Sequence, residues 1–188
     1  GAIGIIFVSG DIVKLCFGEK YILDISIPFI LALNFYIVGM QNAVYTYKNT
    51  MGLFRYGQYI LLITASINLV LDIILGKTMG IFGIYLASAI ARLLTNIWYE
   101  PYAVFKYGLK VSSFHYLKKY IEYAIVLCVT GGICCFLCNL CQFYIVVNVL
   151  LKFAICSIVP NIIFYVCYHK TDEGKYLIEI IKSVLRKI

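Results

Sequence analysis

The sequence has few charged residues, which make up only 13% of its 188 positions. A soluble domain typically carries about 25% charged and about 45–50% apolar residues, whereas 63% of this chain is apolar. The excess of apolar residues gathers in runs of roughly 18–22 residues, which are long enough to cross a hydrocarbon layer of about 30 Å. The scarcity of charge therefore argues against a soluble domain and predicts an integral membrane protein.

Motifs of catalytic and nucleotide-binding sites are also missing. The chain has no G-x-x-x-x-G-K-[ST] loop to hold phosphate groups, and no pair of carboxylates placed for acid–base chemistry. It does have eight cysteines, and the run CCFLCNLC contains the C-x-x-C spacings that some zinc sites show. Six of the eight lie inside apolar runs and the other two at or near the end of one, and free cysteine behaves as a small hydrophobic residue there. We therefore expect no metal, no disulfide, no cofactor and no enzyme.

Apolar runs of transmembrane length follow one another along the chain. Backbone groups in lipid must be hydrogen-bonded within their own segment, so these runs are expected to be helices. We predict an all-α integral membrane protein, a polytopic bundle that starts with the end of one helix at Gly1–Ser9. Five complete spans follow: Ile27–Tyr47, Gln58–Leu75, Ile81–Tyr99, Tyr120–Leu140 and Ile145–Tyr168. Because the sequence begins inside an apolar run, we expect a C-terminal part of a longer protein, which lacks its N-terminal half.

Lysine and arginine alternate between the connections in a way that predicts the orientation. Alternate connections and the tail are basic, with Lys48, Arg55, Lys106, Lys110, Lys118, Lys119, Lys170, Lys175, Lys182, Arg186 and Lys187. The other connections hold only Lys14, Lys20 and Lys77. The positive-inside rule places the basic connections and the C-terminus in the cytoplasm. The net charge of +7 therefore indicates contact with membrane lipids and not with nucleic acid.

Residues 169–188 are predicted to form a cytoplasmic amphipathic helix after the transmembrane bundle of residues 1–168. Thr171 is a suitable N-cap with acidic residues behind it. Apolar residues then repeat at helical spacing, while Lys182, Arg186 and Lys187 lie elsewhere around the helix. This pattern is typical of a helix that lies on the inner leaflet. A solvated tail is the alternative.

Polar residues share one stripe of the span Ile81–Tyr99. At about 100° per residue, this stripe contains Tyr85, Ser88, Arg92, Asn96 and Tyr99. The opposite side carries Gly80, Gly83, Ala87 and Ala91, small residues that let another helix approach closely. A lipid-facing arginine costs at least about 2.5–3.5 kcal/mol near a helix centre. Arg92 therefore either lines a water-filled cavity, which the aligned Ser88 and Asn96 favour, or extends its side chain to the cytoplasmic surface.

Polar residues also recur in other spans, with Thr64, Asn68 and Asp72 on one, Asn34, Gln41 and Tyr45 on another, and Lys152 and Asn161 on the last. Each alone fits a hydrogen bond between helices, but together they predict a bundle around a hydrophilic cavity. We expect its lining to include Arg92, Asn96, Ser88, Tyr85, Asn68, Asn34, Gln41, Lys152 and Asn161. Cations at this depth suit an anionic substrate such as a diphosphate, which arginine binds through paired hydrogen bonds.

The order of motifs resembles a known family of exporters. The stretch Phe17-Gly18-Glu19-Lys20-Tyr21 precedes a span, and INLVLDIIL leads through a brief turn into GIFGIYLASAIARLL. This is similar to the C-terminal half of bacterial polysaccharide exporters, the O-antigen and capsule flippases of the multidrug/oligosaccharidyl-lipid/polysaccharide superfamily. Their helix with N-x-x-L commonly leads into one with G-I-x-G-A-x-x-A-T. Ile84 stands where the family often has alanine. The resemblance covers most of residues 1–119, and the last two spans match only in layout.

The resemblance implies a function that residue patterns alone do not. Such proteins have two pseudo-repeated bundles around a central cavity, and they flip polyprenyl-diphosphate-linked glycans across the bacterial cytoplasmic membrane by alternating access. The partners implied are the anionic lipid-linked glycan and the membrane lipids, and a proton or sodium ion is a conceivable coupling ion. A multidrug or small-molecule antiporter on the same scaffold is an alternative, for which Asp72 is the one candidate acid. A membrane-embedded glycan transferase or polymerase is a third, which the short outer connections disfavour, and a purely structural role is a fourth.

Overall fold

A computed structural model gives the fold of the chain, and every regular element among its described residues is a helix. It describes residues 1–18, 20, 24–53, 55, 57–110, 112–139, 145–169, 171, 174–176, 179–180 and 183. The chain divides into two compact units, unit 1 with Gly1–Ala124 and unit 2 with Ile125–Ile188. Helix α5 (Phe114–Asn139) begins in unit 1 and ends in unit 2.

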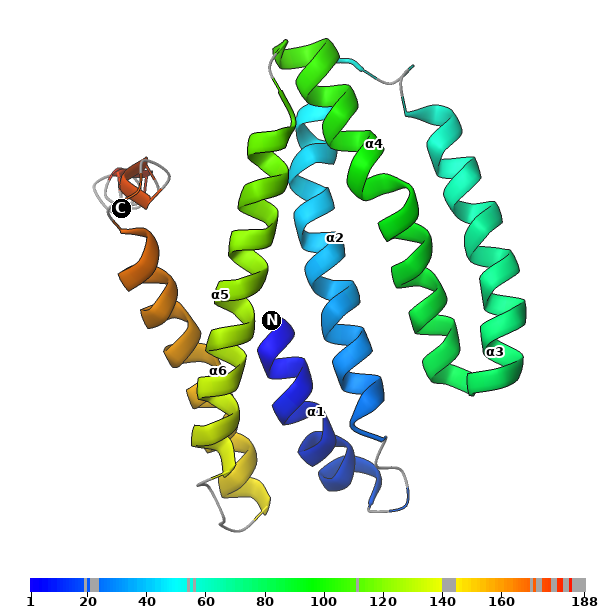
Figure 1. Ribbon diagram of the computed structural model, residues 1–188. Coiled ribbons are helices and arrows are strands. Elements are labelled where there is room, and N and C mark those ends of the chain that lie inside the picture. The colour runs from blue at the N-terminus through cyan, green and yellow to red at the C-terminus, as the bar shows by residue number, and fades with distance from the viewer. Residues whose placement is uncertain are drawn as a thin grey trace. The chain divides into compact units, whose positions relative to one another are not determined.

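Helix α2 is the element of unit 1 against which most of its other helices pack. The unit contains α1 (Ala2–Phe17), α2 (Ser26–Thr50), α3 (Gln58–Leu94), α4 (Asn96–Ala103), the π-helix η3 (Val104–Leu109) and the start of α5. Of these, α2 packs against α1, α3, α4 and η3 (Figure 1). Unit 2 contains the rest of α5 and α6 (Ile145–Tyr168).

Four helical stretches in the described part of the chain are long and apolar enough to cross a membrane: Ser26–Thr50, Gln58–Leu109, Tyr116–Asn139 and Val147–Tyr168. Large apolar side chains along them are exposed, for example Leu62, Leu69 and Ile162. An apolar surface of this kind is characteristic of a lipid or protein contact and not of a free surface in water. For the described residues, the prediction of an all-α fold with helices of membrane-spanning length is confirmed.

Several helices extend beyond the predicted spans. Helix α1 continues to Phe17, helical structure continues past Tyr99 to Leu109, and α5 begins at Phe114. The apolar runs predict only the part of a helix that crosses hydrocarbon, whereas the backbone hydrogen bonds of a helix can continue among polar residues at the membrane surface. Helix α6 has the predicted bounds Ile145–Tyr168.

Helix α3 reverses direction at Gly80 and therefore consists of two arms, residues 58–79 and 81–94. Gly80 has φ 61° and ψ −139°, a backbone conformation that essentially only glycine adopts without strain. A Cβ atom added at Gly83 would lie 2.1 Å from the carbonyl oxygen of Leu75 on the other arm. The reversal occurs within the predicted turn between Leu75 and Ile81, and Figure 1 shows the two arms running in opposite directions.

Hydrogen bonds hold the arms of α3 together at the end away from Gly80. The Thr64 hydroxyl lies 2.8 Å from Thr95 Oγ1 and 2.9 Å from Asn96 Oδ1. Thr64 and Asn96 are equally far along the chain from Gly80, as are Gly76 and Ile84, which also meet. The pairing in register along both arms shows that α3 forms a closed helical hairpin.

The predicted amphipathic helix of residues 169–188 lies largely outside the described residues, including Lys182, Arg186 and Lys187. At its start, the backbone N–H of Gly174 donates a hydrogen bond of 3.3 Å to Thr171 Oγ1. This is the bond that an N-cap residue makes. Residues 174–176, 179–180 and 183 are helical.

Replacing Gly83 with alanine should destabilise the hairpin. We expect a loss of about 1–3 kcal/mol in the free energy of unfolding, the usual cost of overpacking, because the new methyl group would overlap Leu75. Gly39→Ala in α2 is the matched control, since no atom lies within 4 Å of its added Cβ. Thermal unfolding of both purified variants in one detergent measures the difference, and equal midpoints would contradict the close approach of the two arms.

Candidate functional site

Three polar residues of α2, Asn34, Gln41 and Lys48, recur at a spacing of seven residues. Positions seven apart lie on nearly the same side of a helix, with a drift of only about 20°. Each of the three contacts the second arm of α3 or α4, and the partners are Tyr85, Arg92 and Glu100. We call these three contacts the polar seam.

The first contact of the polar seam joins a side chain to the backbone. Asn34 Nδ2 donates hydrogen bonds to the carbonyl oxygen of Tyr85 at 2.9 Å and to that of Ile30 at 3.0 Å. Tyr85 therefore enters the seam through its backbone, while its side chain remains partly exposed. Asn34, which the sequence predicts in the cavity lining, connects α2 to the second arm of α3.

The second contact contains the arginine that the sequence singles out. Arg92 Nη1 donates a hydrogen bond of 3.2 Å to Gln41 Oε1, and both side chains are half-buried. Arg92 thus lies at the interface of α2 and α3. The bond uses one of the five N–H groups of the guanidinium, and its acceptor is a neutral amide, so the positive charge is not neutralised by this contact.

The third contact is a buried ion pair that sequence reasoning missed. Lys48 Nζ lies 3.1 Å from Glu100 Oε1, and the two side chains are only 4% and 5% exposed. The ammonium also stands 5.1 Å from the centre of the Tyr45 ring. The predicted spans end at Tyr47 and Tyr99, so Lys48 and Glu100 are expected in the connections that follow. The seven-residue spacing from Asn34 through Gln41 to Lys48 is the signal that could have found this contact.

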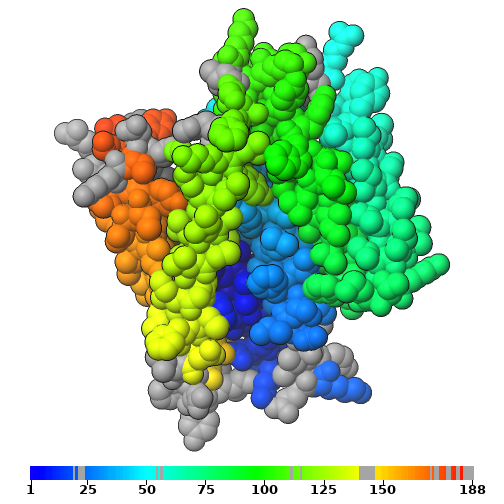
Figure 2. Space-filling model, in the orientation of Figure 1, coloured from blue at the N-terminus to red at the C-terminus, as the bar shows by residue number. Residues whose placement is uncertain are grey.

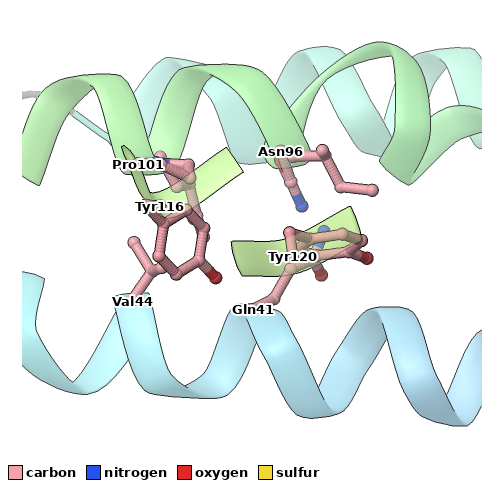
Figure 3. A pocket seen from close by; sticks show the side chains of 8 residues that line it. Gln41, Val44, Asn96, Pro101, Tyr116 and Tyr120 are labelled. Carbon is pink, nitrogen blue, oxygen red and sulfur yellow. The ribbon is translucent and has the colours of Figure 1, made fainter. Parts of the chain in front are cut away.

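A small cavity lies beside the polar seam, between α2, α4 and the start of α5 (Figure 3). Its polar lining comes from Gln41, Asn96, Glu100, Tyr116 and Tyr120. The volume is about 10 Å³, close to the room that one water molecule needs. Gln41 Nε2 and Tyr120 Oη are buried and make no hydrogen bond within the described part of the chain. A water molecule in this cavity has polar groups to bind.

Tyrosines of α5 hold its first turns against α2. The Tyr116 hydroxyl donates a hydrogen bond of 3.1 Å to the carbonyl oxygen of Met40, and the Tyr36 hydroxyl donates one of 2.6 Å to that of Tyr120. The rings of Tyr36 and Tyr120 meet edge to face with 5.3 Å between centroids. These contacts close the cavity on the α5 side.

The structure brings together five of the predicted cavity residues, Asn34, Gln41, Tyr85, Arg92 and Asn96. Ser88 is half-buried on the same arm as Arg92. Asn68 lies on the other arm of α3 and donates a hydrogen bond of 2.8 Å to Asp72 Oδ2. Lys152 and Asn161 belong to α6 in unit 2, where Lys152 is half-buried and Asn161 Nδ2 bonds the carbonyl oxygen of Ser157 at 2.6 Å.

The small residues predicted for helix packing lie along the second arm of α3. Gly83, Ala87 and Ala91 are buried, and the two alanines are fully inaccessible. Gly80 instead forms the reversal of the hairpin. No group of three or more histidine, cysteine or acidic side chains gathers at one point within the described ranges. The polar seam offers hydrogen bonding and charge, centred on Arg92 and the Lys48–Glu100 pair.

Removing one partner of the buried ion pair should be far more costly than removing both. Lys48→Met leaves the Glu100 carboxylate buried without its countercharge, and we expect a loss of about 3–5 kcal/mol in stability. The double variant Lys48→Met with Glu100→Leu should recover most of that loss. Thermal unfolding of the wild type, both single variants and the double variant gives the coupling energy. Additive losses would show that the two side chains do not form a pair in the folded protein.

Comparison with known proteins found no relative of this chain. No protein-family model matches the chain, and no curated protein or solved structure matches it either. The resemblance of the Asn68 helix and the Gly80–Gly83 motif to polysaccharide exporters stays a prediction, and support for a function comes from the residues and geometry of this chain.

Proposed function

We propose that this chain is part of a transporter that flips a polyprenyl-diphosphate-linked oligosaccharide across the bacterial cytoplasmic membrane by alternating access. The observation that carries the proposal is the position of Arg92. It lies in an apolar helix, at an interface between helices, and its hydrogen bond partner among the described residues is the neutral amide of Gln41. Among the described residues no carboxylate neutralises it, and an anionic substrate offers the charge that the site lacks.

The sequence resemblance supports the same function. Two stretches resemble the polysaccharide exporters. INLVLDIIL lies in the first arm of the α3 hairpin, and GIFGIYLASAIARLL begins at Gly80 and forms the second arm. The second of these stretches carries Arg92 and ends at Leu94, two residues before Asn96. The substrate implied by the resemblance contains a diphosphate, and a guanidinium binds phosphate oxygens through paired hydrogen bonds.

A small-molecule or multidrug antiporter is the second candidate, and Asp72 favours it. Its Oδ2 accepts the hydrogen bond from Asn68, while its Oδ1 is buried and has no partner among the described residues. A buried carboxylate with one unsatisfied oxygen is a suitable place for a proton or a cation. Loss of transport in an Asp72→Asn variant with unchanged glycan export would favour this second candidate.

We further propose that each arm of α3 crosses the membrane, which gives five complete spans after the end of a sixth and a cytoplasmic C-terminus. The hairpin at Gly80 and the apolar surface of both arms support this topology. The tip of the hairpin would then lie outside the cytoplasm, and the basic residues near η3 inside it.

Cysteine labelling tests this topology. In a variant without the native cysteines, Lys77→Cys should react with a membrane-impermeant maleimide in intact cells. Lys110→Cys should react only after the membrane is permeabilised. Both positions are exposed, so accessibility to the reagent and not burial decides the result. Labelling of both positions from the same side would contradict the proposed crossing.

Arg92→Ala in the full-length protein should block export of the glycan. We expect lipid-linked oligosaccharide to accumulate on the cytoplasmic leaflet at an unchanged protein level, with partial recovery in Arg92→Lys, because a lysine retains the charge but not the paired donors. Leaflet-specific detection of the intermediate measures this. Arg55→Ala is the matched control, since it removes a cation from a connection between helices.

Gln41→Met separates substrate binding from helix packing. This change removes the acceptor from Arg92 but leaves the guanidinium in place. If Arg92 binds the substrate, export should continue in Gln41→Met and stop in Arg92→Ala. If Arg92 only joins α3 to α2, both variants should lose the same amount of activity and stability, and the flippase proposal would lose its structural support.

A further inference from the structure

Unit 1 also contains a larger hollow. It lies on the opposite side of α4 from the small cavity beside Gln41. Its volume is about 610 Å³, and its walls are mainly apolar and aromatic. Its lining comes from the first arm of α3, from the segment that runs from the end of α3 through α4, and from the start of α5. The apolar and aromatic residues include Ile60, Ile63, Ile67, Leu94, Trp98 and Leu117. We call this hollow the aromatic groove.

The aromatic groove extends along the helices toward the end of unit 1 where η3 carries Lys106. Its wall on α3 extends from Ile67 to Ile60, about 10 Å at 1.5 Å per residue. This is within the roughly 15 Å of hydrocarbon that one leaflet contributes to a bilayer. Trp98 and Tyr102 are both exposed in its wall, and such side chains prefer the level of the lipid head groups.

A lysine stands at the end of the groove. Tyr102 lines the groove, and its hydroxyl accepts a hydrogen bond from Lys106 Nζ. The ammonium also lies 4.8 Å from the ring centre of Tyr102 and 5.5 Å from that of Tyr107. Lys106 is exposed, and no carboxylate of the described residues pairs with it. The groove is thus apolar along its length and positively charged at one end.

We propose that the aromatic groove binds one anionic glycerophospholipid, with an acyl chain between the arm Ile60–Ile67 and α4 and with the phosphate at Lys106. The groove complements such a lipid. Its deep part is apolar, where the acyl chain would lie, and its end is cationic, where the anionic head group would lie. Its length matches a chain that stays within one leaflet. The basic residues at this end are expected in the leaflet that is rich in anionic lipid. The site is independent of what the protein transports.

Native mass spectrometry of the purified full-length protein with added lipid tests the site. With phosphatidylglycerol and phosphatidylcholine offered together, the wild type should retain one phosphatidylglycerol in preference. Lys106→Gln should reduce this preference about fivefold, which corresponds to the roughly 1 kcal/mol that one basic residue contributes near a membrane surface. Lys77→Gln removes an exposed lysine at the hairpin tip and is the matched charge control.

A pair of neighbouring substitutions separates the groove from the general lipid surface. Ile63→Trp places a bulky ring in the groove and should weaken retention of the lipid, while Leu62→Trp adds the same side chain at an exposed position of α3 that does not line it. Equal retention in these two variants would overturn the proposal. Preferential retention of polyprenyl phosphate over phosphatidylglycerol would overturn the identity of the lipid, and equal retention of phosphatidylcholine would overturn the role of Lys106.

Discussion

The buried ion pair between Lys48 and Glu100 sets how α2 lies against α4 and α3. Only 4% and 5% of the two side chains are exposed, so loss of either partner would leave a buried charge without its countercharge. Since Lys48, Gln41 and Asn34 are seven residues apart, this one contact also brings Gln41 opposite Arg92 and Asn34 opposite the backbone of Tyr85. All three contacts of the polar seam are formed in the same register of α2.

The hairpin also fixes the position of the first arm of α3 relative to the second arm. The reversal at Gly80 and the contacts of Thr64 with Thr95 and Asn96 join the two arms at both ends. The first arm is therefore placed through the second, although most of its own large side chains are exposed apolar residues. The small cavity beside Gln41 and the aromatic groove lie on either side of the segment that the ion pair and the hairpin hold in place.

Much of this architecture is predictable from the sequence, because it follows from local patterns. Apolar runs predict the helices, and the GKTMG stretch after INLVLDIIL predicts a turn where α3 reverses. Helical spacing places Arg92 and Asn96 on one stripe, and both take part in contacts between helices. The resemblance to polysaccharide exporters lies in these same stretches, and their place in the hairpin neither requires nor contradicts it.

The partners of the polar residues are not predictable in this way. Gln41 and Arg92 are 51 residues apart, and nothing local to either indicates the other. Lys48 and Glu100 follow apolar runs, so hydropathy assigns them to the membrane surface, although the helices continue past both and bury them. A pairing between distant helices depends on which faces meet, and periodicity describes one helix at a time.

The three contacts of the polar seam differ in kind along its length. At Asn34 a neutral amide meets a backbone carbonyl, at Arg92 a cation meets an amide, and at Lys48 a cation meets an anion. Hydrogen bonds between charged groups are roughly twice as strong as neutral ones, so the interface becomes harder to separate from the Asn34 end toward the Lys48 end. If α2 and α3 were to separate as rigid bodies, the contact at Asn34 would break at a lower free-energy cost than the ion pair of Lys48 and Glu100.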